Sequence, residues 1–373
     1  MTTLDGEVVA FAAAAEEWLA KSVPERWREH RGALSEHEID EIRLEWDRQL
    51  FRGGYAGLSI PVEFGGRGLG LAEEVVFGEL AARAHAPDGF GRIGKILTAP
   101  TLISRGSEEQ RKRYLPPILS GDEAWCQGFS EPGAGSDLAA VSAFAKPKGD
   151  GFAVSGQKVW TSFATHADKC LFLAKTDQDA PRHRNLTMLL VDMKQPGVTV
   201  KPIRQISGSS HFAEVFFDDA YCSAEDVLGD VGDGWSVAMT VFANERGGVE
   251  GISRYVEMRG DMDVLLNCCA NLRNQQEAAR ALETRVEVVR WQVAKALSRI
   301  EDEAAFLSST GVMKLMWSEL WQELTEMGIA SMCEQHEDHW RYQYLETRAT
   351  TIYAGSSEIQ RNIIGDRILG LPR

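Results

Sequence analysis

The sequence predicts an α+β protein with a helical N-terminal domain, a middle antiparallel β-domain and a helical C-terminal domain. Two observations predict this order. Apolar residues recur at helical spacing in the first and last thirds of the chain, whereas the part between consists of short runs rich in β-branched and aromatic residues. The expected domains are residues 1–120, 121–225 and 226–373.

The N-terminal part contains amphipathic segments joined by short loops. In the first of them, four apolar residues share one helical face: Val8, Phe11, Ala15 and Trp18. The stretch "SIPVEFGGRGLG" (59–70) is rich in Pro and Gly and predicts a break between helices. The stretch "SEEQRKRYLPPILSG" predicts a capped helix that stops at Pro116-Pro117, because proline cannot donate a helical hydrogen bond.

The middle part contains five runs that predict strands, divided by Gly, Pro and Asp: "GFAVSGQKVW", "KCLFLAKT", "LTMLLVDM", "VTVKPIRQI" and "AEVFFDDA". No helical pattern separates these runs. Strands so close together favour an antiparallel sandwich or a small barrel over a parallel sheet.

The helical period returns after "GDVGDGW". Six apolar residues follow each other at steps of three or four: Leu282, Val286, Val289, Val293, Leu297 and Ile300. Such a seam predicts antiparallel helix packing or an oligomer interface. The stretch "GVMKLMWSELWQELTEMG" predicts a further amphipathic helix.

Composition excludes several classes of function. A net charge of −15 argues against nucleic-acid binding, which needs a basic surface, and against docking on anionic membranes. No apolar run approaches the roughly 20 residues that span a bilayer, and the acidic start does not match a secretory signal, so a cytoplasmic protein is expected. Six cysteines without CxxC spacing are expected to be reduced thiols, and the histidines of "HEDH" (336–339) lack a third metal ligand.

Two stretches of the β-domain suit a ligand. In "WCQGFSEPGAGSD" (125–137), small residues around a Pro-Gly turn expose successive backbone N–H groups, and Ser130 and Ser136 add hydroxyls. The stretch lacks the features of a P-loop or a dinucleotide fingerprint, and a plain turn is the alternative. In "GQKVWTS" (156–162), Trp160 can cover a flat ligand and Ser162 can reach its polar edge, the alternative being a tryptophan in the core.

These stretches carry a specific resemblance. "YLPPILSGDEAWCQGFSEPGAGSDLA", "GFAVSGQKVWTSFATHAD", "AEVFFDDA…VLGDVGDGW" and "IYAGSSEIQRNIIGDRILGLPR" resemble the acyl-CoA dehydrogenases, in the order of that family and over nearly the whole chain. The resemblance implies a C-terminal four-helix bundle and non-covalently bound FAD. It implies an enzyme that introduces an α,β-double bond into an acyl-CoA thioester.

The resemblance also implies roles for individual residues. Phe129 and Ser130 would line the flavin ring, while Trp160 and Ser162 would cover it and hydrogen-bond near N5. The expected cofactor-binding residues are Gln127, Phe129, Ser130, Ser136, Trp160, Thr161, Ser162, Ser356 and Glu358. The expected substrate-binding residues are Ser136, Arg246, Ala354 and Gly355, with the main-chain N–H of residue 354 on the thioester carbonyl.

The last of these residues belong to "TIYAGSSEIQR" (351–361), which predicts a helix start with Ser357 as the cap and Gln360 three residues on. Many family members have the catalytic glutamate where this chain has Ala354. In a minority the base lies on an earlier helix directly before an arginine, as Glu245 precedes Arg246 here. Glu245 is therefore the expected base, and a solvated helical glutamate is the alternative. The alanine also leaves space that favours a branched, bulky or steroid-derived acyl group.

The resemblance implies an electron-transfer flavoprotein as the electron acceptor. The C-terminal stretches that hold a neighbouring subunit's FAD in the family are unclear here, in "DMDVLLNCCANLRN" and "TEMGIASMCEQHED". A homodimer or tetramer is expected, or a hetero-oligomer with a related chain. Other reactions on the same fold stay open: an acyl-carrier-protein dehydrogenase, a flavin oxidase or an N-hydroxylase. A non-catalytic partner subunit stays open as well.

Overall fold

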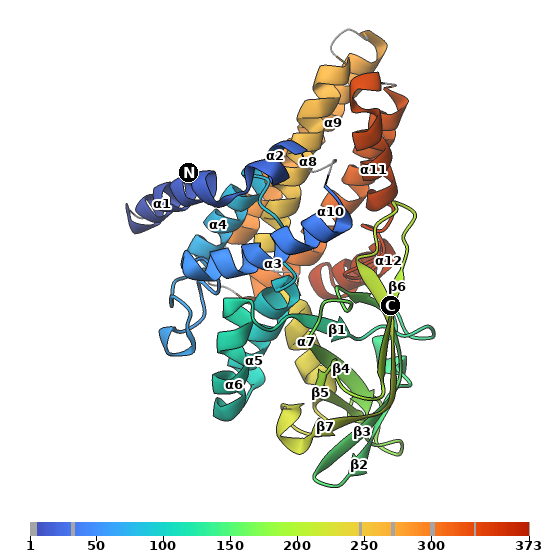
Figure 1. The fold of residues 1–373 in the computed structure, drawn as a ribbon. Helices are drawn as coiled ribbons and strands as arrows, with labels where there is room; N and C mark the ends of the chain where they lie inside the picture. The colour runs from blue at the N-terminus through green and yellow to red at the C-terminus, as the bar shows by residue number, and fades with distance from the viewer. Residues whose placement is uncertain are drawn as a thin grey trace. The chain divides into compact units, whose positions relative to one another are not determined.

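The computed structural model describes residues 6–30, 34–245, 248–269, 273–298, 303–331 and 333–372 (Figure 1). The chain divides into two compact units, each described by itself below. The first unit comprises residues 1–77 and 84–245, and the second comprises residues 78–83 and 246–373. Among the described residues, no helix combines the length and apolar character needed to cross a membrane.

Helices form the first part of the chain, as predicted. They are α1 (Gly6–Ser22), α2 (Glu25–His30), α3 (Glu36–Arg52), α4 (Leu71–Arg83), α5 (Ala99–Arg105) and α6 (Glu108–Ser120). The expected apolar face of α1 packs inward: Val8 and Ala15 are buried, and the Trp18 ring lies 4.7 Å from that of Tyr55. The Pro/Gly-rich stretch forms the break between α3 and α4, with the short helix η2 (Val62–Phe64) inside it.

The predicted stop of α6 at Pro116-Pro117 is wrong, because the helix runs through both prolines to Ser120. Its start agrees with the sequence: Ser107 and Gln110 form a capping box. The two lost helical hydrogen bonds are offset by burial, since apolar side chains on both flanks of the prolines are fully enclosed: Tyr114, Leu115, Ile118 and Leu119. The helix ends instead at Gly121, whose φ of 79° suits glycine.

Eight strands form one sheet: β1 (Trp125–Gly128), β2 (Phe144–Lys148), β3 (Gly151–Ser162), β4 (Lys169–Lys175), β5 (Leu186–Asp192), β6 (Val198–Ile203), β7 (Phe212–Ser223) and β8 (Val227–Leu228). The five predicted runs are confirmed as β3 to β7. Most neighbours are antiparallel, as predicted. However, β1 runs parallel to β4, and β2 joins β4 in parallel through the single pair Phe144 and Lys175.

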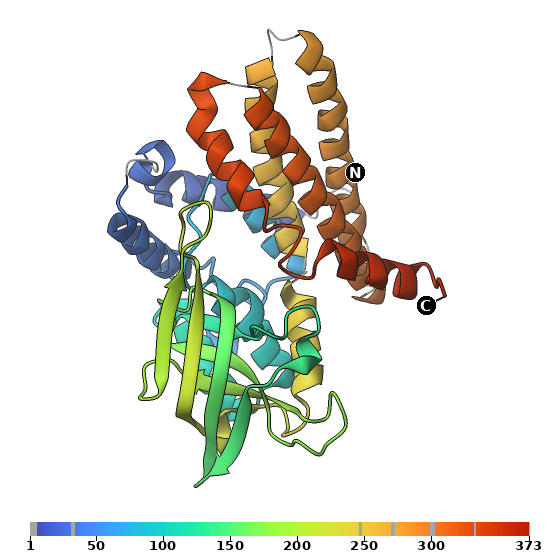
Figure 2. The same ribbon diagram turned by 90° about the vertical axis from the view of Figure 1, so that its right-hand side faces the viewer.

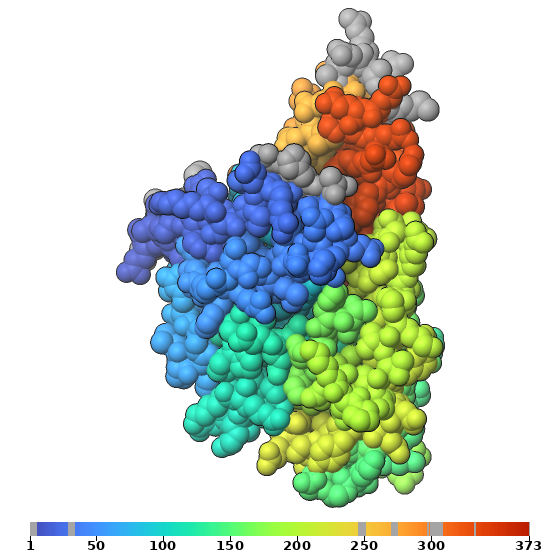
Figure 3. Space-filling view, viewed as in Figure 1, coloured from blue at the N-terminus to red at the C-terminus, as the bar shows by residue number. Residues whose placement is uncertain are grey.

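Strands β4 and β5 are buried on both faces, which explains their unbroken apolar sequences. Met188 and Leu190 enter a core shared with α5, α6 and α7 (Gly234–Glu245), whereas Leu189 and Val191 enter a core with β3 and β7. In the space-filling view the N-terminal helices, blue to teal, and the strands, green to yellow, share a continuous surface (Figure 3). The first unit therefore joins helices and sheet through a common core.

The second unit is a helical bundle, which Figure 2 shows in orange and red. Its long helices are α8 (Gly248–Cys269), α9 (Arg273–Leu297), α10 (Glu303–Ala330) and α11 (Glu337–Thr347), followed by α12 (Ser357–Ile363). The predicted seam of α9 is confirmed at four positions that are at most 4 % exposed: Leu282, Val286, Val289 and Val293. The Leu297 side chain and Ile300 lie outside the described residues. His339 of the "HEDH" stretch lies 3.0 Å from the buried carboxylate of Asp261.

Candidate active site

The first part of the site is the loop that leaves β1. Its reverse turn is closed by two hydrogen bonds, from Glu131 N to Ala134 O and from Ala134 N to Glu131 O, of 2.9 and 3.0 Å. Phe129 is buried, whereas Gln127 and Ser130 are partly exposed and Ser136 is exposed. A side chain added at Gly133 or Gly135 would meet open space. The loop is thus an ordered turn whose outer edge is free for a ligand.

A buried ion pair beneath this loop escaped sequence analysis. Lys158 of β3 is 0 % exposed, and its ammonium lies 2.8 Å from the Glu131 carboxylate. It also donates to the carbonyls of Phe129 at 3.2 Å and Leu173 at 2.7 Å. Glu131 in turn accepts from the main-chain N–H groups of Ser142 and Ala143. The pair therefore fastens the loop to the sheet.

The environment affects the pKa of both partners. Burial lowers the pKa of Lys158, because an ammonium ion loses its hydration there, although Glu131 opposes the shift. Burial alone would raise the pKa of Glu131, but the Lys158 ammonium and the hydrogen bonds from Ser142 outweigh it and keep that pKa below its ordinary value. The Lys158 ammonium and the Glu131 carboxylate compensate each other's charge. The ion pair thus opposes the effect of burial on both partners.

The second part of the site is a β-bulge at the end of β3. The register between β3 and β7 shifts between Lys158 and Thr161, and Trp160 has a left-handed φ of 60°. A bulge re-aims a side chain, and a left-handed tryptophan is strained backbone of a kind that concentrates at functional sites. Trp160 is 57 % exposed as a residue. A hydrogen bond of 2.9 Å from Val159 N to Ser130 O joins the bulge to the β1 loop.

The residues after the tryptophan add hydroxyl groups. Ser162 is partly exposed, whereas Thr161 is fully buried in the ladder opposite Ala213. The Thr161 Oγ1 has no hydrogen-bond partner among the described residues. Buried hydroxyls rarely stay unpaired, so this atom marks unused hydrogen-bonding capacity beside Trp160. An exposed flat ring beside serine hydroxyls fits a planar ligand with a polar edge.

Helix α7 approaches this part of the site. The ring of Phe242 on α7 contacts Phe129 edge to face, with centroids 5.7 Å apart, and Asn244 donates to Thr101 at 3.1 Å. The helix ends at Glu245. The Glu245 side chain and Arg246, the predicted base and its neighbour, lie outside the described residues. The contact through Phe242 nevertheless places the end of α7 beside the β1 loop.

The predicted residues of the second unit lie in a turn before α12. Ala354 and Gly355 are consecutive left-handed residues, with φ values of 53° and 89°. The predicted cap is wrong by one position: Ser356 caps α12 by accepting from Ile359 N, and Ser357 is buried inside the helix. The Gln360 side chain does not return to the cap but donates to the Ala354 carbonyl at 3.0 Å. The chain turns at Ala354 and Gly355, directly before the Ser356 cap.

An open groove of about 490 Å³ lies along this turn. Its lining includes Thr351, Ser356, Glu358, Gln322 and Arg361. Ser356 and Glu358 are two of the predicted cofactor-binding residues, and Arg361 is paired with Glu319 at 2.6 Å. The groove is therefore polar and carries charges of both signs.

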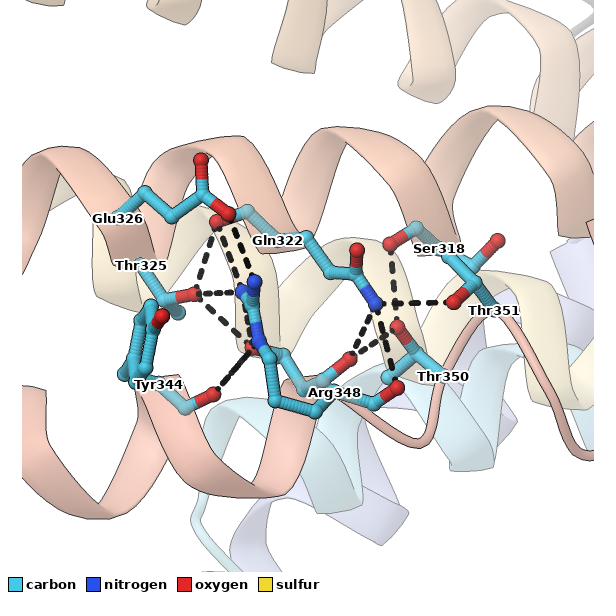
Figure 4. A network of polar contacts seen from close by, with 9 residues as sticks. Ser318, Gln322, Thr325, Glu326, Tyr344, Arg348, Thr350 and Thr351 are labelled. Atoms are coloured by element: carbon cyan, nitrogen blue, oxygen red, sulfur yellow. Dashed lines mark hydrogen bonds and ion pairs between the residues drawn. The ribbon is translucent and has the colours of Figure 1, made fainter.

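Helix α10 supports the turn through a polar stripe, here defined as Lys314, Ser318, Gln322 and Thr325. Their spacing of four, four and three residues puts them on one helical face. Gln322 donates to the Thr347 carbonyl and the Thr351 hydroxyl at 2.9 and 3.0 Å, while Thr350 donates to the Ser318 carbonyl at 3.1 Å (Figure 4). Arg348 adds an ion pair with Glu326 at 2.7 Å. Hydrogen bonds from α10 thus hold the residues before the turn.

The predicted site residues fall into two sets, and the structure describes each set by itself. The first unit contains Gln127, Phe129, Ser130, Ser136, Trp160, Thr161 and Ser162. The second contains Ala354, Gly355, Ser356 and Glu358. Sequence analysis missed the Lys158–Glu131 pair and the polar stripe. The signal for the stripe was the repeat of polar residues every three to four positions in α10. The sequence around Lys158 gives no local signal for the ion pair.

Residues 6–122 match the acyl-CoA dehydrogenase N-terminal domain, residues 126–220 the middle domain and residues 232–369 the C-terminal domain. The chain is 40 % identical to acyl-CoA dehydrogenase IpdE1 of Mycobacterium tuberculosis, covering 98 % of both chains.

Solved structures share the fold. A structure described as the Tcur3481-Tcur3483 steroid ACAD superposes with a TM-score of 0.83 at 23 % identity, covering 99 % of this chain and 98 % of the other. The ChsE4-ChsE5 complex from Mycobacterium tuberculosis gives a TM-score of 0.80 at 22 % identity, with both chains fully covered. The fold class predicted from the sequence is confirmed. The chain belongs to the acyl-CoA dehydrogenase family and is an oxidoreductase of that kind.

Proposed function

We propose that the protein uses FAD to introduce an α,β-double bond into an acyl-CoA thioester, with Glu245 as the base. The reaction removes a proton from the α-carbon and a hydride from the β-carbon. The proton passes to the Glu245 carboxylate. The observation that carries the proposal is the exposed, left-handed Trp160 on a bulge that is hydrogen-bonded to the β1 loop through Ser130.

The residues at this edge of the sheet fit FAD. Trp160 offers an exposed ring, Ser130 and Ser162 offer hydroxyls, and the unpaired Thr161 hydroxyl lies in the same segment. Phe129 and Ser130 would line the flavin, while Trp160 would cover it and Ser162 would donate to its edge. Gln127, Ser136, Ser356 and Glu358 complete the proposed cofactor set. When bound, FAD would accept the hydride that leaves the β-carbon.

Glu245 is assigned as the base because Ala354, at the usual position of the base in the family, cannot accept a proton. Ala354 carries only a methyl group, which cannot take a proton. Glu245 is the last residue of α7, and the contact of this helix with Phe129 through Phe242 supports the assignment. A carboxylate in a dry pocket has its pKa raised from about 4.3 towards neutrality, which suits a general base. Arg246 is proposed to bind the substrate.

The turn before α12 would bind the acyl group. The Ala354 N–H donates no hydrogen bond to the described residues. It is therefore available to the thioester oxygen, with Gly355 beside it. Negative charge develops on that oxygen as the α-proton leaves, so a fixed donor there stabilises the transition state.

The missing glutamate side chain at residue 354 favours a branched, bulky or steroid-derived acyl group. We therefore expect Ala354→Glu to lower kcat/KM for ring-bearing acyl-CoAs at least about tenfold relative to short linear ones, because the added side chain would occupy the acyl space. Steady-state kinetics with a matched set of linear, α-branched and ring-bearing acyl-CoAs would check this. A wild-type enzyme that strongly prefers short linear substrates would contradict the acyl-group assignment.

The role of Trp160 can be separated from folding. Trp160→Gly should lower flavin retention but change the free energy of unfolding by less than about 1 kcal/mol, because glycine accepts the left-handed backbone and the ring is largely exposed. The flavin-to-protein ratio after gel filtration, together with urea unfolding, measures both effects. Trp291→Ala is the control, since Trp291 is 68 % exposed on α9. Unchanged flavin retention in Trp160→Gly would exclude the ring from the cofactor site.

The proposed function predicts a yellow protein whose flavin absorbance bleaches anaerobically on mixing with an acyl-CoA. Rapid oxygen consumption by the reduced enzyme would identify an oxidase instead. Reaction only with acyl-carrier protein would identify a carrier-dependent dehydrogenase. A colourless protein that gains flavin only with a second, related chain would point to a partner subunit.

We further propose that an electron-transfer flavoprotein accepts the electrons and that the protein works as an oligomer. The unclear C-terminal stretches support a hetero-oligomer with a related chain over a homomer. In one of them, Asp261 is engaged inside the bundle by Trp321 at 2.6 Å and Gln343 at 3.2 Å. Native mass and flavin content of the chain, alone and co-expressed with a related chain, would separate the two assemblies.

A further inference from the structure

The turn at Ala354 is held in a strained conformation. Left-handed backbone is unfavourable for a residue with a Cβ atom, so Ala354 at a φ of 53° needs support from its surroundings. The support comes from two buried polar side chains. Gln360, 0 % exposed, donates to the Ala354 carbonyl at 3.0 Å, and Lys314, 4 % exposed, donates to the Gly355 carbonyl at 2.7 Å.

The chain on either side of the turn is also fixed. Before the turn, the polar stripe of α10 binds residues 347–351. After it, the Ser357 N–H donates to the Thr351 carbonyl at 3.0 Å and closes a loop around residues 352–356. Lys314 belongs to the same stripe but reaches further along the chain than its other members. It is the stripe residue that holds the turn itself.

A buried lysine at this contact costs free energy. Burying an ammonium ion forfeits its hydration, and an apolar residue would satisfy the packing of α10 without that cost. Charge-assisted hydrogen bonds are shorter and stronger than neutral ones. The Lys314 contact therefore restrains the Gly355 carbonyl and its peptide plane more firmly than a neutral donor would, while Gln360 restrains the preceding peptide plane through the Ala354 carbonyl.

We propose that Lys314 is a positioning residue of the dehydrogenation. Together with Gln360 it fixes the orientation of the Ala354 N–H, which meets the thioester oxygen. The inference rests on the proposed function, since it needs an acyl thioester at this turn. Small errors in the placement of a donor cost large factors in rate, so the effect of Lys314 is kinetic as well as structural.

The test uses the flavin-loaded enzyme and a 3-thiaacyl-CoA. Sulfur at position 3 lets the α-carbon lose a proton but leaves no β-hydride, so the ligand stops as the enolate, whose absorbance can be titrated with pH. Lys314→Met should move the titration midpoint of the bound ligand to higher pH by about one unit, because the enolate oxygen loses a well-placed donor. With a reactive acyl-CoA, kcat should fall about 10- to 100-fold.

Two further variants separate the positioning role of Lys314 from a loss of folding. Lys314→Gln retains a donor and should recover part of the loss, and it replaces Lys314→Met if that protein does not fold. Lys295→Met, on the exposed face of α9, should behave as wild type. A lower melting temperature with an unchanged enolate titration and kcat would overturn the positioning role. If the wild-type enzyme itself forms no enolate, the proposed function fails and the inference fails with it.

Discussion

Replacing Glu245 by glutamine should slow anaerobic flavin reduction by acyl-CoA about a thousandfold, the usual contribution of a positioned general base. Glutamine keeps the shape and hydrogen-bonding capacity of the side chain but cannot take the α-proton. Binding should change little, because neither the cofactor residues nor the Ala354 turn is altered. Stopped-flow absorbance of the flavin, with the enzyme in excess over one turnover, measures the step directly.

Glu109→Gln is a matched control for this variant. Glu109 is exposed on α6 in the same unit, so its replacement removes one surface charge and should leave the rate unchanged. A Glu245→Gln enzyme that bleaches its flavin at the wild-type rate would exclude Glu245 as the base. The double variant Glu245→Gln with Ala354→Glu asks whether a carboxylate at the usual family position restores part of the rate.

Breaking the buried ion pair should cause the largest loss of stability. Lys158→Met leaves the Glu131 carboxylate, only 5 % exposed as a residue, without its counter-ion. Removing one partner of a buried pair costs about 3–5 kcal/mol, because an uncompensated charge stays in the core. The β1 loop would also lose its anchor to β3, so flavin retention should fall. Urea unfolding and the flavin-to-protein ratio measure the two effects.

A second substitution tests whether charge is the cause. Glu131→Gln added to Lys158→Met removes the stranded charge and should recover part of the lost stability, giving a large coupling energy in the double-mutant cycle. Additive losses would show that the pair acts through packing alone. Both proteins should be compared in urea at the same pH.

The contribution of Glu131 to the free energy of unfolding should depend on pH with opposite sign in the wild type and in Lys158→Met. In the wild type the pKa of Glu131 is below its ordinary value, so the stability it contributes is present near neutral pH and is lost as the pH falls through the folded-state pKa. In the variant, burial without a counter-ion raises that pKa above the unfolded value. Acidification then protonates the carboxylate and should raise the stability relative to neutral pH.

The regular parts of the fold were predictable because their signals are local. The runs of β3 to β7 and the seam of α9 each contain their own periodicity. Strand β1 was not predicted, because four residues ending in glycine pair in parallel with β4, more than 40 positions later. The end of α6 was predicted wrongly from its prolines, because the burial of Tyr114 and its neighbours outweighs this local helix-breaking signal.

The arrangement of the residues in the candidate site could not be predicted from the sequence. Trp160 was expected to be exposed or in the core, and only the bulge decides between these alternatives. Lys158 and Glu131 lie 27 positions apart, and nothing local indicates that their charges pair in the core. Lys314 was read as part of an amphipathic helix. Its function depends on which turn packs against it, which is a property of the bundle.

Deuterium incorporation at the α-carbon tests whether Glu245 is the group that removes the α-proton. In D₂O, the flavin-loaded enzyme is incubated with a 3-thiaacyl-CoA, and exchange at the α-carbon is followed by NMR. We expect rapid exchange in the wild type and in Glu109→Gln, and exchange near the uncatalysed rate in Glu245→Gln. Wild-type exchange in Glu245→Gln would show that another group removes the α-proton.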